Sequence, residues 1–516
     1  MLTVEQLQTY TVDEIEKCLQ GHGESINDYP EMPKQDRSLV PEIGNRLIHD
    51  ELNYNIKTLA EEHHKLMSRM IDEQRGIYDA IMNRVQERKP SIFFLYGYGR
   101  TRKTYLWRSM AAASRSKGEI VITVASSRTA HSRFCIPLDI HETSSCTITP
   151  DSDLAKLIAR AKLIILDEAP ILHRHCFEAI DRALRDVLRS YNGGKLDIPF
   201  GGKVVVLGGD FRQILLVIPK GTQQEVVHAT INSSYLWDYC EVHTLNTNMR
   251  LLSGSSGSNV EEMKAFGDWI LGIGDGSVGE SNDVHILLDV SQDLLIPSNG
   301  DPLAAIVNST YPDLFCYGDD MSYFKDRAIL APTNAIVELV NEYMLSLMPG
   351  DEKTYLSCDS KCSADSNVCG LGDVHTLEFL NTITASGLPN YTLKLKVGVP
   401  VMLLRNVDYN LGLCNGTQLI ITRLGKYVLE AKVISGSNVG DKVFIPKLSL
   451  TPFDKRIPFS FQRRQFPLVV SFAMTINKSQ GYSLNHVGVY LPQSVFSMAS
   501  YMLLSLELLQ EMGSEY

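Results

Sequence analysis

Residues 91–104 read SIFFLYGYGRTRKT, and this stretch sets the fold class of the chain. Its apolar first half, 91–96, predicts a short buried strand, and a glycine-containing turn leads into a helix predicted over 102–114. Three more apolar strands are predicted further along the chain, at 119–125, 161–166 and 203–208. A helix is predicted at 176–190, between the last two. Strands that alternate with helices over about 150 residues indicate a parallel α/β sheet.

The turn after the first strand resembles a phosphate-binding loop. Such a loop has the form G-x-x-x-x-G-K-[ST], and the chain offers Gly97, Gly99, Lys103 and Thr104. In the loop, backbone N–H groups hold the β-phosphate, the lysine reaches the β- and γ-phosphates, and the hydroxyl binds Mg²⁺. The glycine before the lysine is Arg102 here, with Arg100 nearby, and a side chain at positive φ costs roughly 1–3 kcal/mol. Taken alone, this stretch leaves a phosphate loop and an ordinary strand-to-helix turn both open.

Polar residues follow the next strands of the predicted sheet. Asp167 and Glu168 come directly after 163–166, and in phosphate-loop NTPases the first acid holds Mg²⁺ while the second orients water. Gln213 ends the segment GGDFRQ and is a candidate sensor of the γ-phosphate. Arg250 ends LNTNMR and is a candidate to reach that phosphate from outside the domain. Each of these residues, considered singly, is also compatible with an ordinary loop that follows a strand.

Charge is distributed unevenly along the 516 residues. The whole chain has a net charge of −11, from 49 Lys and Arg against 60 Asp and Glu. Residues 390–478 hold 13 Lys and Arg against four acids, which makes this segment +9, whereas 251–320 hold 12 acids and one Lys. A basic block in an acidic protein is typical of a localised phosphate-binding face, and equally of a solvated β-rich domain that happens to be basic.

The second half of the chain predicts another α/β unit with an insertion. A strand at 328–332 and a helix at 334–348 begin this unit, and it resumes at 468–473. Short strands with Gly and Asn turns over 392–450 predict a small barrel inserted between them. In the first half, apolar residues at helical spacing predict a further helix from His64 to Gln86.

Composition excludes several classes of protein. No uncharged apolar run reaches the roughly 18–20 residues that span a bilayer, and the N-terminus has acids where a signal peptide would be apolar. The ten cysteines are scattered, which fits a reduced intracellular compartment. Four possible zinc ligands, Cys358, Cys362, Cys369 and His375, have irregular spacing in a Ser/Asp/Gly-rich segment. That spacing favours a loop over a zinc site.

The order of these motifs resembles one family closely. The quoted motifs are Asp-Phe-Arg-Gln at 210–213, Asn-Met-Arg-Leu at 248–251, Pro-Val-Met-Leu-Leu-Arg-Asn at 400–406 and Thr-Ile-Asn-Lys-Ser-Gln-Gly at 475–481. With them the chain resembles the Pif-type helicases of superfamily 1B, and most of all the helicase domain of plant Helitron-type transposons. The resemblance runs from the segment 45–54 to Phe496.

The resemblance implies an α/β fold of two RecA-like P-loop NTPase domains with parallel sheets and a small β-barrel-like insertion in the second. The implied parts are an acidic lead-in at 1–60, the first RecA-like domain at 61–250, an acidic linker at 251–325, the start of the second RecA-like domain at 326–390, the basic insertion at 391–465 and the remainder at 466–516. It implies an ATP-dependent, 5′→3′ DNA helicase that acts in recombination, repair and telomere maintenance. It further implies a nuclear monomer on single-stranded or forked DNA, with no membrane partner.

The resemblance also assigns roles to residues. Catalytic roles fall to Lys103, Asp167, Glu168, Gln213 and Arg250, and Mg²⁺ to Thr104 and Asp167. ATP binding falls to Gln74, which would read adenine, and to Gly97, Tyr98, Gly99, Thr101, Lys103 and Thr104. DNA binding falls to His131, Phe134, Thr475, Asn477, Lys478 and Gln480. Trp107 and Tyr105, which follow the loop, are expected in the core.

Three departures from the family pattern predict weakened activity. The loop glycines are replaced by Arg100 and Arg102. About ten residues usual for the family are missing between 127 and 128, where a DNA contact would form. The last family motif, Tyr-Val-Ala-Leu-Ser-Arg, here ends in Leu506 instead of arginine, and the chain ends ten residues later. An alternative hypothesis is therefore a catalytically impaired DNA-binding protein from a decayed transposon copy or a faulty gene model.

Overall fold

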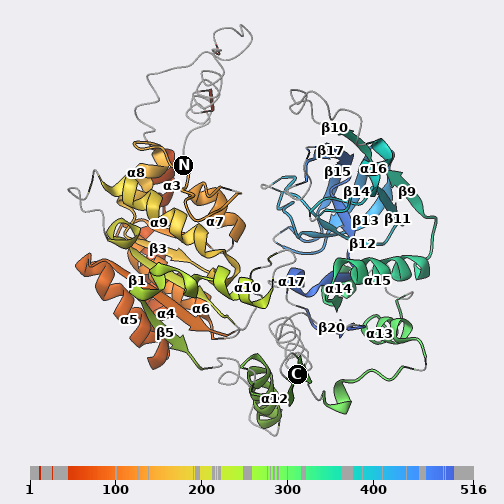
Figure 1. Ribbon diagram of the computed structural model, residues 1–516, viewed down its shortest axis with the longest axis horizontal. Helices are drawn as coiled ribbons and strands as arrows, with labels where there is room; N and C mark the ends of the chain where they lie inside the picture. The colour runs from red at the N-terminus through yellow and green to blue at the C-terminus, as the bar shows by residue number, and fades with distance from the viewer. Residues whose placement is uncertain are drawn as a thin grey trace. The chain divides into compact units, whose positions relative to one another are not determined.

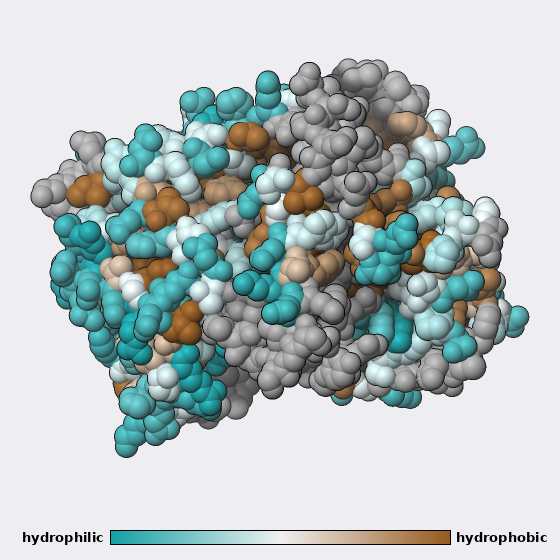
Figure 2. Space-filling view, turned by 90° about the horizontal axis from the view of Figure 1, so that it is seen from below, coloured by the Kyte–Doolittle hydropathy of each residue, from teal (hydrophilic) through white to brown (hydrophobic). Residues whose placement is uncertain are grey.

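The chain divides into two compact units, 1–256 and 257–516, each described by itself (Figure 1). In the computed structural model the described residues are 11–12, 26, 45–98, 101–124, 127–137, 139–189, 191, 198–211, 216, 218, 222–247, 259–275, 277–278, 280–282, 285–287, 290–298, 300–314, 321–361, 376–385, 387–408, 411–436, 438–452, 459, 461–479, 482 and 484–492. None of the helices formed by these residues has the length and apolar character of a membrane span. Figure 2 shows one face of the molecule, where hydrophobic side chains are scattered among hydrophilic ones.

Unit 1 is built on a five-stranded parallel sheet of order β2-β3-β4-β1-β5. Its strands are β1 (Ser91–Gly97), β2 (Val121–Val124), β3 (Leu163–Leu166), β4 (Val204–Gly209) and β5 (Cys240–Leu245). The first four confirm the strands predicted from the apolar runs. Both faces of the sheet are covered at β1 to β4, which is why these strands read as continuous apolar runs, whereas β5 at the edge of the sheet is mostly exposed.

Helices cover the sheet of unit 1 on its two faces. Phe93 and Leu95 of β1 pack with α5 (Asp72–Glu87) and α6 (Lys103–Arg115), whereas Ile92 and Phe94 pack with α7 (Ser127–Phe134), α8 (Asp153–Arg160) and α9 (Arg174–Arg189). The helix predicted from His64 to Gln86 is two helices, α4 (Ile56–Ser68) and α5. The break lies at 69–71, where Ile71 takes an extended backbone as the N-cap of α5. Helical periodicity continues across this break, so the apolar pattern did not reveal it.

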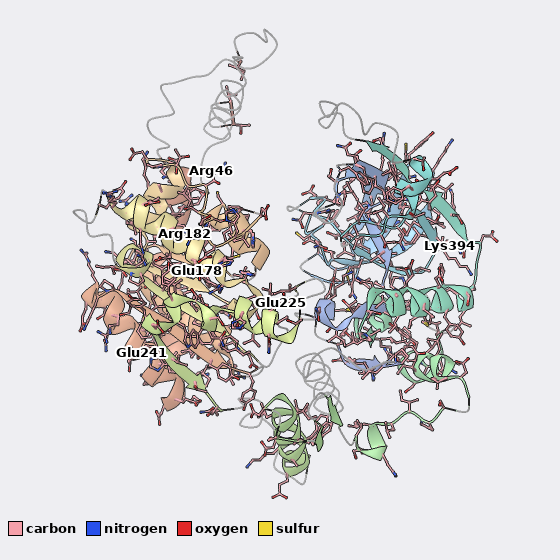
Figure 3. The ribbon with its side chains drawn as sticks, in the orientation of Figure 1. Arg46, Glu178, Arg182, Glu225, Glu241 and Lys394 are labelled. Atoms are coloured by element: carbon pink, nitrogen blue, oxygen red, sulfur yellow. The ribbon has the colours of Figure 1, made fainter. Side chains whose placement is uncertain are left out.

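Polar contacts fix α9 in unit 1. The buried Glu178 accepts a hydrogen bond from Ser234 at 2.8 Å and one from His175 at 2.9 Å. Arg182, one turn later, donates to the Ser144 carbonyl at 2.9 Å (Figure 3). Burial raises the pKa of Glu178, but the bonds from His175 and Ser234 outweigh this effect and hold the pKa below its usual value. The carboxylate therefore stays ionised and ties α9 to the segment before β5.

Unit 2 contains a second, smaller parallel sheet. Its order is β19-β8-β20, with β8 at Arg327–Ala331, β19 at Ala473–Thr475 and β20 at His486–Val489. The helix α15 (Asn334–Leu347) packs on it, and the buried Asn341 donates to the carbonyls of Val470 and Ala473. The single strand predicted at 468–473 is therefore two strands, β18 (Leu468–Val470) and β19, which belong to different sheets.

Between α15 and β19 the chain forms the β-rich insertion. A five-stranded antiparallel sheet has the order β15-β14-β13-β12-β18. The strands are β12 (Pro400–Leu403), β13 (Gln418–Leu424), β14 (Val428–Val433) and β15 (Lys442–Pro446), with β18 as the fifth. Two smaller sheets, β10-β17-β16 and β11-β9, complete the insertion; their strands are β9 (Lys353–Leu356), β10 (Cys358–Lys361), β11 (Thr392–Leu395), β16 (Leu448–Leu450) and β17 (Phe461–Gln465). Together with the two parallel sheets, this confirms the predicted fold class.

A buried ion pair fastens this insertion. Arg463 is 0% exposed, and its Nη2 lies 2.7 Å from Oδ2 of Asp359, its direct partner across β10 and β17. The guanidinium also donates to the carbonyls of Leu380, Ile383 and Pro389. Arg463 was counted in the basic block, but its charge is neutralised inside the protein, so it adds nothing to a phosphate-binding face.

We expect Asp359→Ala to destabilise unit 2 strongly. Loss of one partner of a buried ion pair leaves the other charge uncompensated and costs about 3–5 kcal/mol. The measurement is the urea unfolding midpoint, combined with hydrogen exchange of the backbone at 358–361. Asp441→Ala is the control, because Asp441 is an exposed acid of the same unit. Equal losses in the two variants would contradict a structural role of the buried pair.

Candidate functional site

The site of unit 1 lies where parallel strands end. In the β1–β4 pairing Leu95 is opposite Gly208, and in the β3–β4 pairing Leu166 is opposite Leu207. The loop after β1, the acids after β3 and the Gly-Gly-Asp segment at the end of β4 therefore meet at one edge of the sheet. Ligands of open α/β sheets bind at this carboxyl edge.

The loop after β1 is held closed by its own atoms. A Cβ added to Gly97 would lie 2.7 Å from Thr101 Oγ1 and 3.1 Å from Leu245 Cβ, so only glycine fits there. Thr101 donates to the Tyr98 carbonyl at 2.8 Å, and the Tyr98 hydroxyl donates to the Asn246 carbonyl at 2.8 Å. Gly99 and Arg100 lie outside the described residues. The described part of the loop is compact and anchored to the end of β5.

Arg102 has the backbone that the glycine of a phosphate loop provides. Its φ is 59° and its ψ is 44°, in the left-handed region, and it forms the N-cap of α6 without a side-chain capping bond. The bend therefore forms in spite of the substitution. For a residue with a Cβ, this left-handed backbone has a steric cost of about 1–2 kcal/mol. The Arg102 side chain is exposed and points away from the core.

Lys103 and Thr104 begin α6 directly after this bend. The Lys103 ammonium donates a hydrogen bond to the Gly97 carbonyl, so it spans the loop from the helix back to the strand. Thr104 is exposed in the first turn of the helix. The first turn also leaves backbone N–H groups without a helical partner, which suits an anion.

The start of α5 supports the loop from the side. Gln74 is 1% exposed, and its Nε2 donates to the Thr101 carbonyl at 3.2 Å. No described residue donates a hydrogen bond to its Oε1. The neighbouring Glu73 accepts from the backbone N–H of Asn246 at 2.8 Å and of Thr247 at 3.3 Å. Gln74 thus contacts the loop and keeps a buried acceptor unused.

The acid after β3 is positioned by a tryptophan. Trp107 of α6 is buried, and its Nε1 donates to Asp167 Oδ2 at 2.8 Å. The other carboxylate oxygen accepts from the Glu168 backbone N–H at 3.0 Å. A Cβ at Gly208 would lie 2.4 Å from the Trp107 ring, so this glycine makes room for the indole. Trp107 lies in the core as predicted, but its bond to Asp167 had no signal in the sequence.

Glu168, the second acid, stands in a strained position. Its φ is 57°, in the left-handed region, and its side chain is half-buried. Residues in this region cost of order 1–3 kcal/mol and cluster at functional sites.

The structure corrects one predicted contact and leaves others open. Phe134 is 0% exposed in the core of unit 1, so its ring cannot stack on a base, whereas His131 on the same helix is half-buried. In unit 2 Thr475 is half-buried, and Asn477 and Lys478 are exposed on α17 (Ile476–Ser479). Like Gly99 and Arg100, the residues Gln213, Arg250, Gln480 and Leu506 lie outside the described residues.

The described residues contain no cluster of three or more potential metal ligands. Of the four candidate zinc ligands, Cys358 lies exposed in β10, and Cys362, Cys369 and His375 fall outside the described part of the chain. The zinc alternative is therefore not tested by the structure.

The chain has two units with a parallel sheet in each and a β-rich insertion in the second, and the loop before α6 lies at the carboxyl edge of the sheet in unit 1. Residues 69–284 match the PIF1-like helicase family, and residues 378–424 match the 2B domain of DNA helicase Pif1. Parts of both units are therefore similar to Pif1-type helicases.

Individual relatives agree with these two matches. The chain is 24% identical over 347 residues to the ATP-dependent DNA helicase PIF1 of Danio rerio, covering 67% of this chain and 44% of that protein. It is 26% identical over 339 residues to the Pif1 of Psychrobacter sp., covering 63% and 43%. The chain therefore spans less than half the length of the curated relatives that it matches.

Solved structures share the fold. Bacteroides Pif1 in complex with ADP-AlF3 and ssDNA has a TM-score of 0.55 at 19% identity, covering 84% of this chain and 90% of that one. Pif1 from Candida albicans has a TM-score of 0.52 at 18% identity, covering 85% and 92%.

We expect Arg102→Gly to stabilise unit 1. The change removes the steric cost of a left-handed non-glycine residue, so the free energy of unfolding should rise by roughly 1 kcal/mol. Arg108→Gly is the matched control, because Arg108 is an exposed arginine in the interior of the same helix. It should lower stability by about 1 kcal/mol. The measurement is urea unfolding of both variants, and a loss of stability in Arg102→Gly would show that the arginine side chain makes stabilising contacts.

Proposed function

We propose that this chain is an ATP-dependent DNA helicase that moves 5′→3′ on single-stranded DNA. The observation that carries the proposal is the carboxyl-edge site of unit 1, where the Lys103 loop, Asp167 and Glu168 converge. All three lie in the region that matches the PIF1-like helicase family. The neighbouring structures include Pif1 bound to ssDNA and Pif1 at forked dsDNA. These supply the proposed partner, single-stranded or forked DNA.

ATP would bind across the loop of unit 1. Lys103 would exchange its bond to the Gly97 carbonyl for the β- and γ-phosphates, and the N–H groups of the first turn of α6 would hold the phosphates. Gln74 would read adenine, since its unused Oε1 can accept from the adenine amino group. Gln213 and Arg250 would contact the γ-phosphate.

Mg²⁺ fits the residues at this edge. Each oxygen of Asp167 accepts one hydrogen bond and keeps a further lone pair, and the exposed hydroxyl of Thr104 is an oxygen donor of the kind that Mg²⁺ prefers. Mg²⁺ would neutralise charge on the phosphates. Glu168 would accept a proton from the attacking water, and the strained backbone would direct its carboxylate there.

DNA would contact unit 2 through Thr475, Asn477, Lys478 and Gln480, and His131 would contribute from unit 1. ATP binding and hydrolysis would alternately close and open the two units and advance the strand. We further propose a nuclear monomer with the family's roles in recombination, repair and telomere maintenance. A closeness to the Helitron-type helicases would make the chain a divergent copy, whose activity depends on how well Arg100, Arg102 and Leu506 are tolerated.

We expect ATP hydrolysis that increases with single-stranded DNA and falls at least about tenfold in Lys103→Ala, because that variant loses the cation on the β- and γ-phosphates. The measurement is phosphate release by the purified chain with and without an oligonucleotide. Lys117→Ala, an exposed lysine in the turn that follows α6, is the control.

DNA binding without hydrolysis would instead support the catalytically impaired alternative, which the relatives do not favour. In that case Arg102→Gly combined with Leu506→Arg should restore turnover. An absence of both binding and hydrolysis would exclude the helicase proposal.

We expect Gln74→Leu to weaken ATP binding by roughly tenfold and GTP binding much less. The variant removes the amide that would pair with adenine, and a lost hydrogen bond to a buried partner costs about 1–2 kcal/mol. The measurement is competition of both nucleotides against a fluorescent ATP analogue. Gln86→Leu, on the exposed face of the same helix, is the control. Equal losses for ATP and GTP would assign Gln74 to loop support alone.

A further inference from the structure

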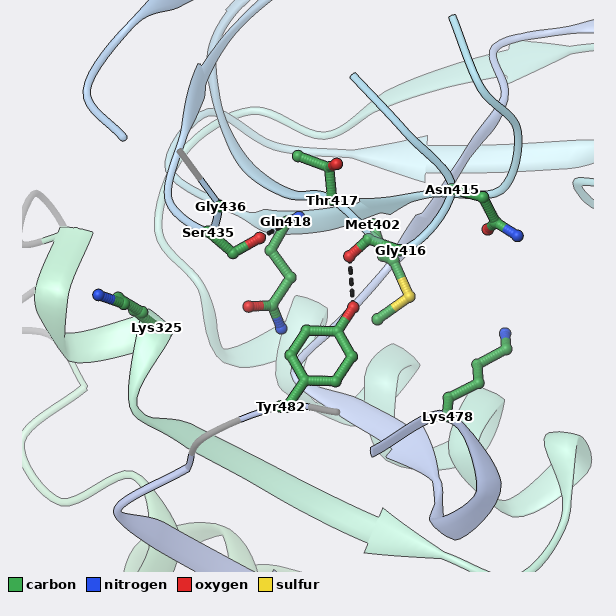
Figure 4. Close-up of a pocket in the computed structure, with 10 residues that line it drawn as sticks. All are labelled: Lys325, Met402, Asn415, Gly416, Thr417, Gln418, Ser435, Gly436, Lys478 and Tyr482. Carbon is green, nitrogen blue, oxygen red and sulfur yellow. Dashed lines mark hydrogen bonds between the residues drawn. The ribbon is translucent and has the colours of Figure 1, made fainter. Parts of the chain in front are cut away.

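Unit 2 contains a cavity of about 580 Å³ between the β-rich insertion and the loop that follows α17 (Figure 4). This volume lies within the range of small-ligand sites, about 300–1,000 Å³. The residues that matter to its chemistry are Lys325, Met402, Asn415, Gln418, Lys478 and Tyr482. They come from β12, β13, the loop before β13, α14 (Met321–Lys325) and the segment 476–482.

Gln418 places an unused acceptor in the wall of this cavity. Its side chain is 2% exposed, and no described residue donates a hydrogen bond to its Oε1. Its backbone N–H is satisfied by Ser435 Oγ at 2.9 Å, so the fold does hold the residue in place. Figure 4 shows the nitrogen of the amide toward the Tyr482 ring and the oxygen on the side of Lys325. A buried acceptor without a donor costs about 1–3 kcal/mol, which a ligand with an N–H or O–H group would relieve.

Two lysines stand at the cavity on opposite sides of Tyr482 (Figure 4). Lys325 and Lys478 are both exposed, and among the described residues neither forms an ion pair. No Asp or Glu is among the described residues that line the cavity. The cavity therefore favours a ligand that carries negative charge.

Tyr482 and Met402 give the cavity an apolar wall. The Tyr482 hydroxyl donates to the Gly416 carbonyl, and burial raises the pKa of this phenol to about 12, so the bond persists at physiological pH. Gly416 has a φ of 93°, and a Cβ added to it would lie 3.3 Å from that hydroxyl. The ring is thus fixed, and with the buried Met402 it can pack against a flat base.

We propose that this cavity binds one nucleoside phosphate, with the base against Tyr482 and Met402, a base N–H donating to Gln418, and the phosphate near Lys325 or Lys478. A nucleotide combines a flat ring, an N–H donor and a phosphate in one molecule. It could be one residue of single-stranded DNA, in which case the inference rests on the proposed function, or a free nucleotide. Every DNA base carries an N–H on its pairing edge, so the site would be tolerant of sequence.

The test uses the full chain and a fluorescent 12-nucleotide single strand without ATP. We expect Gln418→Leu and Lys325→Ala each to weaken binding about five- to tenfold. The effect of Lys325→Ala should shrink at high salt and that of Gln418→Leu should not, because only the first is electrostatic. With a strand of abasic nucleotides, Gln418→Leu should bind as the unmodified chain does.

Two matched controls separate binding from folding. Lys394→Ala changes an exposed lysine of the same unit outside the cavity (Figure 3) and should leave DNA affinity unchanged. Gln465→Leu removes a buried glutamine whose amide donates to the Tyr355 and Tyr391 carbonyls and accepts from Phe466, so it should lower the melting temperature. Gln418→Leu should not lower it, since its acceptor is unused. Should Gln418→Leu fail to fold, Lys325→Ala still tests the site at the surface.

A second arm identifies the source of the nucleotide. It measures calorimetric binding of dAMP, which lacks the β- and γ-phosphates that Lys103 would reach. A free nucleotide is the ligand if two results are found together. First, dAMP binds equally to the unmodified chain and to Lys103→Ala but does not bind to Gln418→Leu. Second, Gln418→Leu binds DNA as the unmodified chain does. The inference is overturned if Gln418→Leu changes neither DNA nor dAMP binding, or if the unmodified chain binds neither. A chain that binds dAMP but not DNA would overturn the proposed function and keep this site.

Discussion

The parallel pairing of β1 with β4, and of β4 with β3, brings the ends of three strands to one edge of the sheet in unit 1. The glycines at this edge then allow close approach: Gly97 lets the loop fold over Thr101, and Gly208 leaves room for the Trp107 ring. The indole in turn holds Asp167 through its N–H. A shift of one residue in the strand register would separate these groups, since side chains alternate between the two faces of a strand.

The site contains backbone strain at two positions, Arg102 and Glu168, both in the left-handed region. Such conformations persist only where the surrounding structure enforces them. At Arg102 the enforcement comes from the anchored loop on one side, through Thr101 and Gln74, and from α6 on the other. The loop keeps its geometry although the residue that would favour it, glycine, is absent.

The charge count of the sequence indicated a basic face on unit 2, but some of these basic side chains are used inside the unit. The buried Arg463 joins the sheet β10-β17-β16 to the segment 380–389, because its guanidinium contacts Asp359 and three carbonyl groups of that segment. Lys396 and Lys447 also donate to backbone carbonyls of neighbouring segments. The basic residues of this segment are therefore partly structural, and the cavity beside Tyr482 draws on Lys325 and Lys478 from outside the inserted strands.

The sequence by itself determined the alternation of strands and helices in unit 1, the place of the loop before α6, the acids after β3 and the β-rich insertion, because apolar runs, glycines and turn residues act locally. Only the tertiary structure decided that Phe134 is buried, that Trp107 holds Asp167, that Arg463 pairs with Asp359, and that Gln418 faces a cavity. Asp359 and Arg463 are 104 residues apart in the chain. Contacts over such separations depend on strand pairing and packing, and no local pattern of residues records them.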